Sequence, residues 1–104
     1  MSTEHDKLAE GLKKTIIHPG NRKILSELMK RTLSPLDISK ITQIPRSTVY
    51  TSLKMFQHYG IVTVDHIEII KGAKIIFYST TIKGFVYTIT QNHDEVGFTL
   101  KPEE

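Results

Sequence analysis

The sequence of 104 residues has no cysteine and no tryptophan, and none of its hydrophobic stretches is long. Without cysteine the chain can form no disulfide framework and no thiolate zinc site, and it has no thiol nucleophile. No apolar run approaches the roughly 20 residues that a membrane-spanning helix needs. The first six residues are polar and acidic, unlike a secretory signal, so we expect a cytoplasmic protein without membrane contact.

The residue patterns of the common enzyme classes are also missing. There is no Gly-rich phosphate loop and no nucleophile elbow, and the few acidic residues are scattered along the chain. We therefore expect neither enzymatic activity nor a cofactor.

Acidic residues are scarce in the middle of the chain. Residues 11–93 contain four acidic and twelve basic residues, a net charge of +8, whereas residues 1–10 and 94–104 hold the other seven acids. A basic body between acidic ends suits a polyanionic partner. The alternative is a solvated surface with an uneven distribution of charge.

Hydrophobic periodicity predicts helices in the first half of the chain. A leading helix within residues 1–18 has one apolar stripe, and the Pro-Gly pair that follows His18 ends it. A second helix runs from about Asn21, a good N-cap, to Arg31. Ser34 can cap a short third helix over residues 35–42, which Pro35 begins.

A longer helix follows a turn of three residues, Gln43 to Pro45. It begins near Arg46 and ends at Tyr59, with Gly60 in the position that favours glycine after a helix. Its inner face is apolar, with Val49, Leu53 and Phe56, and its outer face is small, polar and basic.

The period then changes to that of β-strands. Residues 61–64, 67–70 and 75–79 are rich in β-branched and aromatic side chains, and residues 71–74 between them predict a hairpin tip. The apolar phase slips at Asp65-His66, which indicates a bulge.

A stripe at helical spacing predicts a closing helix over residues 80–92, and the tail over residues 93–104 is either a short element or a frayed end. The expected fold is mainly α with a small β-hairpin (α+β). It is one domain, residues 1–104, with the helix-turn-helix and wing over residues 21–79 and extra helices at both ends.

This arrangement suits DNA, because the major groove of B-DNA is about 12 Å wide and accepts one α-helix. Side chains on the outer face of the longer helix are short or able to hydrogen-bond, and two lysines lie at the hairpin tip. The predicted DNA contacts are Arg46, Ser47, Thr48, Tyr50, Thr51 and Lys54 on the helix and Lys71 and Lys74 on the hairpin.

Two stretches resemble a known family. The run Ile44-Pro45-Arg46-Ser47-Thr48-Val49-Tyr50, with Leu53, Phe56 and Tyr59-Gly60-Ile61-Val62, resembles the recognition helix of winged-helix transcription regulators, and Tyr78 to Gly84 is similar to the segment after the wing in the PadR and MarR groups. Thr80 departs from the usual apolar residue. The resemblance, which extends to the ArsR group of prokaryotic regulators, implies binding of double-stranded DNA by the recognition helix and wing.

The resemblance also implies a homodimer formed through the terminal helices. Its candidate interface residues are Leu8, Leu12, Ile16, Ile82, Phe85, Val86 and Ile89. The alternative for these residues is burial within one subunit, because a terminal helix needs something to cover its apolar stripe.

Two other functions stay open. A small winged-helix protein can coat or organise DNA, or act in plasmid partition, and a winged helix can also dock on another protein. A protein-docking helix is expected to expose apolar anchors, and Met55 is the main apolar exception on the outer face. Nothing in the residues indicates an effector ligand or the target DNA sequence.

Histidines lie beside carboxylates at two places, but we expect no metal site. The spacing matches no ligand motif, and adjacent residues point in different directions. These histidines can instead tune DNA affinity near neutral pH through their charge. The two groups are Asp65, His66 and Glu68, and His93, Asp94 and Glu95.

Overall fold

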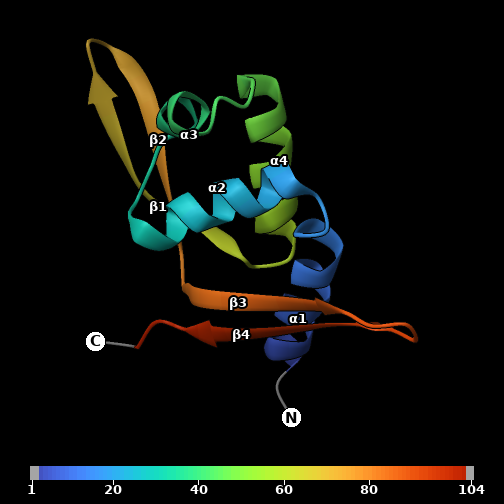
Figure 1. The fold of residues 1–104 in the computed structure, drawn as a ribbon. Coiled ribbons are helices and arrows are strands. Elements are labelled where there is room, and N and C mark those ends of the chain that lie inside the picture. The colour runs from blue at the N-terminus through green and yellow to red at the C-terminus, as the bar shows by residue number, and fades with distance from the viewer. Residues whose placement is uncertain (1–2, 103–104) are drawn as a thin grey trace.

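The computed structural model describes residues 3–102, in which four helices are followed by four strands (Figure 1). The ends of the predicted domain, residues 1–2 and 103–104 with the acids Glu103 and Glu104, lie outside the described residues. The elements are α1 (Thr3–Thr15), α2 (Pro19–Lys30), α3 (Pro35–Thr42), α4 (Arg46–His58), β1 (Val62–Ile70), β2 (Ala73–Thr80), β3 (Ile82–Ile89) and β4 (Asp94–Leu100).

The short helix α3 has the predicted bounds because its ends are specified locally. The Asp37 backbone N–H donates to Ser34 Oγ at 3.2 Å, and the Ser34 N–H donates to Asp37 Oδ2 at 3.3 Å, which completes a capping box. Pro35 occupies the first turn, where no N–H partner is needed. Gln43 ends the helix in the left-handed region at φ +63° and donates its N–H to Ser39 O.

Helix α2 begins two residues before the predicted start. His18 is the N-cap and Pro19 occupies the first turn of α2, whereas α1 already ends at Thr15. Asn21, predicted as the cap, lies inside the helix and is 7% exposed. Its Nδ2 donates to Thr15 O at 2.9 Å, and its Oδ1 accepts from Ser52 Oγ at 2.6 Å. The amide therefore joins α1, α2 and α4.

The hydrophobic core lies between the four helices and the roots of the two hairpins. Gly11 of α1 lies against Tyr59 so closely that an added Cβ would overlap the tyrosine side chain. The fully buried large side chains are Leu12, Ile16, Ile24, Leu25, Leu28, Ile38, Val49, Leu53, Phe56, Ile61, Val62 and Ile82.

Strands β1 and β2 form the wing, an antiparallel hairpin that projects from the body (Figure 1). The register shifts between Val64 and His66, so the predicted bulge is confirmed. The turn consists of Lys71 at φ +51° and Gly72 at φ +79°, and two residues with positive φ are the requirement of a type I′ hairpin turn. The wing is also tied to the body, because Leu33 and Tyr78 exchange two backbone hydrogen bonds.

The predicted closing helix over residues 80–92 is wrong, since residues 82–89 form strand β3 and pair with β4 over residues 94–100. The tail therefore forms a regular strand. The apolar residues of the first segment fit a helical period, but alternate side chains, Phe85 and Tyr87, pack on the core together with Val96 and Phe98 of β4. The backbone hydrogen-bonding groups of β3 pair with β4, a strand formed by the tail. The spacing of apolar residues within β3 does not reveal this pairing. The α+β class and the winged helix-turn-helix are confirmed.

Candidate nucleic-acid interface

Helix α4 has an apolar face and, opposite it, a polar face. Val49, Leu53 and Phe56 are at most 1% exposed and anchor the helix in the core. The residues predicted to contact DNA on this helix, Arg46, Ser47, Thr48, Tyr50, Thr51 and Lys54, are all exposed. The structure thus brings these six residues together on one solvent-facing surface.

Hydroxyl groups of α3 form hydrogen bonds with the backbone of the turn that precedes α4, and hydrophobic periodicity in the sequence does not indicate these bonds. Ser39 Oγ donates to Ile44 O at 2.6 Å, and the Ile44 N–H donates to Thr42 Oγ1 at 3.3 Å. On the inner side of α4, Ser52 donates to Asn21. A polar residue among apolar neighbours was the only signal for Ser52, and it identifies no partner.

A groove of about 160 Å³ separates the start of α4 from the wing. Arg46 and Tyr50 line it from α4, and Lys74 and Tyr78 line it from β2. Burial raises the pKa of the Tyr78 hydroxyl, and the nearby Tyr50 adds to the effect. Tyr50 is 55% exposed, so it flanks the wing while keeping surface for a ligand. Residues of both α4 and the wing therefore line one continuous groove.

The lysines predicted at the wing, Lys71 and Lys74, are both exposed. The two acidic residues of the wing are engaged by one histidine: His66 Nδ1 lies 2.7 Å from Asp65 Oδ2, and His66 Nε2 lies 2.7 Å from Glu68 Oε2. The hydrogen bonds to Asp65 and then to Glu68 raise the pKa of His66 above its usual value. The His66 ring also stacks on Phe77, with ring centroids 4.7 Å apart.

Three of the predicted dimer residues have no surface to offer a partner. Leu12, Ile16 and Ile82 are 0% exposed, so the open alternative, burial within one subunit, holds for them and they are removed from the interface. Leu8 and Phe85 are partly buried against the core. Of the remaining two, Val86 is 65% and Ile89 71% exposed.

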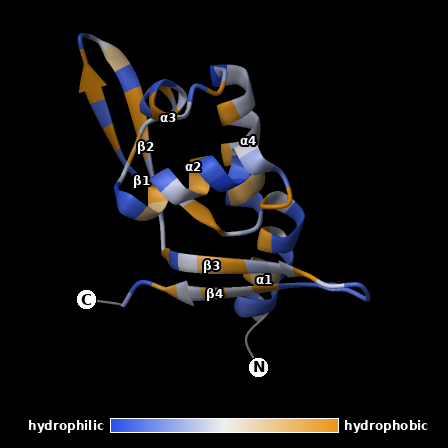
Figure 2. Ribbon diagram, in the orientation of Figure 1, coloured by the Kyte–Doolittle hydropathy of each residue, from blue (hydrophilic) through white to orange (hydrophobic). Residues whose placement is uncertain are grey.

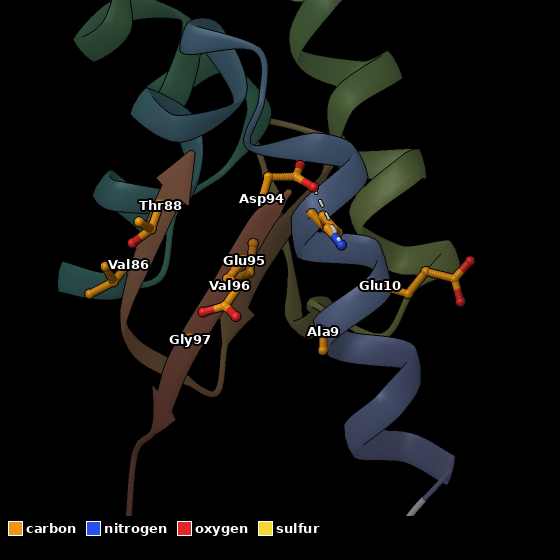
Figure 3. Close-up of a pocket in the computed structure, with 9 residues that line it drawn as sticks. Ala9, Glu10, Val86, Thr88, Asp94, Glu95, Val96 and Gly97 are labelled. Carbon is orange, nitrogen blue, oxygen red and sulfur yellow. Dashed lines mark ion pairs between the residues drawn. The ribbon is translucent and has the colours of Figure 1, made fainter. Parts of the chain in front are cut away.

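An open groove between α1 and the β3–β4 hairpin has a volume of about 610 Å³ (Figure 3). Lys13 Nζ lies 3.4 Å from Asp94 Oδ1, and this ion pair ties the helix to the hairpin. Asp94 also accepts a hydrogen bond from the Tyr87 hydroxyl at 3.0 Å, and this bond, with help from Lys13, lowers the pKa of the Asp94 carboxyl. Lys13 and Asp94 therefore connect the two walls of this groove.

Within residues 3–102 no group of three or more histidine and acidic side chains is placed to hold a metal ion. His93 forms a pair with Glu95 alone, at 2.9 Å. In the same part of the chain, no helix combines the length and the apolar character that spanning a bilayer requires.

Comparisons with known proteins agree with this geometry. Residues 18–64, from the start of α2 to the first residues of β1, match the family model described as "Bacterial regulatory protein, arsR family". Over these residues the chain is similar to the helix-turn-helix of bacterial regulatory proteins. The match covers the helix-turn-helix and stops at the root of the wing, so α1, most of the wing and the β3–β4 hairpin lie outside it.

The winged fold itself occurs in solved structures. The M. tuberculosis protein Rv0081 is similar with a TM-score of 0.57 and 21% identity, over 77% of this chain and 75% of that chain. No curated protein matches the sequence.

Proposed function

We propose that the chain is a dimeric transcription regulator that binds specific sites in double-stranded DNA. Helix α4 would lie in the major groove, and the wing lysines would contact the backbone or the minor groove. The observation that carries the proposal is the exposed polar face of α4 over a buried apolar face. We assign no catalytic step to the chain, and such a regulator would meet its DNA in the cytoplasm.

The charge of the helix-turn-helix favours DNA over a protein partner. No acidic residue occurs between Asp37 and Asp65, so the turn, α4 and the root of the wing carry only basic charges. The large apolar or aromatic side chains exposed on α4 are Tyr50 and Met55, at 55% and 39%. A surface of hydroxyl and basic groups suits phosphates and base edges better than a hydrophobic protein pocket.

A second copy of the chain is the proposed partner of the β3–β4 hairpin. Val86 and Ile89 expose most of their surface and belong to β3, one on each face of the hairpin because side chains alternate along a strand. Exposed apolar side chains commonly mark interfaces. The dimer would thus use the hairpin where related regulators use terminal helices.

Selection of bound sequences from random duplex DNA tests the proposal. We expect a sharp inverted repeat whose half-sites lie about one helical turn apart, roughly 34–36 Å. Binding without sequence preference, with spreading along the duplex, would show a DNA-organising protein instead. If the chain bound no duplex at all, the proposal that the polar face of α4 contacts DNA would be wrong.

The substitution Lys71→Ala tests whether the wing takes part in DNA binding. We expect weaker binding to every duplex and a salt dependence smaller by about one phosphate contact, because a wing lysine should displace counterions from the backbone. Identical affinities for the variant and the unmodified chain across a salt series would remove the wing from the interface.

A further inference from the structure

One face of the wing is apolar and becomes more exposed toward the tip. Side chains of directly paired residues share a face of a hairpin, so the pairs Val64–Tyr78, Ile67–Ile76 and Ile69–Lys74 define what we call the inner wing face. Tyr78 at the root is 8% exposed, whereas Ile67 is 48% and Ile69 70% exposed. Hydrophobic residues extend along both strands beyond the body (Figure 2).

The inner wing face continues the polar surface of α4. Lys74, Ile76 and Tyr78 line the same groove as Arg46 and Tyr50, and of the opposite face only Ile75 reaches it among its lining residues. A duplex that contacts the start of α4 would therefore meet this side of the wing.

The charges around the inner wing face suit a polyanion. No acidic residue occurs between Glu68 and Asp94, and Lys71 and Lys74 flank the exposed isoleucines at the tip. Of the wing acids, Glu68 pairs with Ile75 on the opposite face, and Asp65 and Glu68 both bond to His66, which also belongs to that face. A partner of the inner wing face thus encounters apolar side chains and positive charge together.

We propose that the inner wing face is an apolar wedge for the minor groove of DNA, with Ile69 entering the groove and Lys71 and Lys74 on its phosphates. The minor groove is narrow, about 6 Å wide, and apolar side chains inserted there unstack base steps and bend the duplex by roughly 20–90°. The inference rests on the proposed DNA binding and adds that the wing deforms its site.

The test compares Ile69→Thr with Ile70→Thr by titration and by end-to-end energy transfer on a labelled duplex carrying the selected site. Both changes keep a β-branched residue on an exposed position, but Ile70 pairs with Ala73 on the opposite face. We expect Ile69→Thr to weaken binding about tenfold through lost apolar contact and to reduce the bend. Its salt dependence should stay unchanged, because no charge is lost. Ile70→Thr should retain both affinity and bend.

Four results would overturn the wedge. Equal effects of the two variants, or no effect of Ile69→Thr on affinity and bend, would leave DNA binding intact and remove only the wedge. If Ile69→Thr changed the number of chains per particle in the DNA-free protein, measured by light scattering, the inner wing face would be an interface between copies. Failure of the unmodified chain to bind any duplex would instead end the proposed function on which the wedge rests.

Discussion

Asn21 lies where α1, α2 and α4 meet, and its amide uses both of its ends there. The Nδ2 group donates a hydrogen bond to Thr15 O at the buried C-terminal end of α1, while the Oδ1 atom accepts from Ser52. A buried amide with both ends bonded fixes a single arrangement of the neighbouring helices, because any shift leaves a polar group unpaired. The position of α4, and so of its exposed polar face, depends on this residue.

Asn21→Ala should lower the free energy of unfolding by about 1–3 kcal/mol, because Thr15 O and the Ser52 hydroxyl lose their partner in the interior. Denaturant unfolding measures the loss. Asn92→Ala is the matched control, since Asn92 is exposed in the β3–β4 turn. Equal stabilities of the two variants would show that the bridge contributes nothing.

His66 should titrate above the usual pKa of about 6.5 for histidine, because its protonated ring is held by Asp65 and Glu68. A raised pKa in the folded chain stabilises the fold fully below the unfolded pKa, and this contribution is lost as the pH rises through the raised value. NMR titration of the ring should show the shift, and Glu68→Gln should reduce it. His93→Gln should leave it unchanged, and an unshifted His66 would contradict the geometry of the pair.

At the scale of elements, the first half of the fold was predictable because its signals are local. Ser34, Pro35 and Asp37 specify the start of α3 within four residues, and the face of α4 follows from a single period. The closing segment was mispredicted because a stripe that fits a helix also fits a strand once β4 lies beside it. Likewise, the burial of Leu12 and Ile16 depends on distant neighbours, which a periodic pattern does not contain.

The close contact between Gly11 of α1 and Tyr59 at the end of α4 predicts the effect of a substitution. Gly11→Ala should destabilise the chain by about 1–3 kcal/mol, the cost of overpacking, although alanine favours a helix by up to about 1 kcal/mol. The clash outweighs propensity because the added atom would meet the Cβ and ring of Tyr59, which stem from the end of α4. Thermal unfolding of Gly11→Ala beside Ala9→Gly checks the sign, and a more stable Gly11→Ala would refute the close approach.

As a whole the molecule is elongated, with extents of 52 × 32 × 20 Å. The wing projects at one end and the β3–β4 hairpin crosses the other (Figure 1). The most exposed apolar residues of the β3–β4 hairpin thus lie away from the wing, so the proposed dimer contact would leave the polar face of α4 free.

The double substitution Val86→Gln with Ile89→Gln should convert a dimer into a monomer without changing the charge. Light scattering should give the mass of two chains for the unmodified protein and of one for the variant, and the variant should lose affinity for the full inverted repeat. Ile17→Gln is the control, because Ile17 is 50% exposed but lies beyond the end of α1. A one-chain mass for the unmodified protein would exclude the hairpin dimer.

The bridge between Leu33 and Tyr78 connects the wing to the helix-turn-helix. Each residue donates its amide hydrogen to the carbonyl of the other, at 3.1 and 2.8 Å, and Leu33 directly precedes the Ser34 cap of α3. The two amide hydrogens can exchange with solvent only when the wing root parts from the helix-turn-helix, so their exchange rates report one shared opening. A ligand that contacts the wing and α4 at once must slow the hydrogen exchange of both amides together. The exchange rates of this pair therefore measure how tightly the wing is held against the helix-turn-helix.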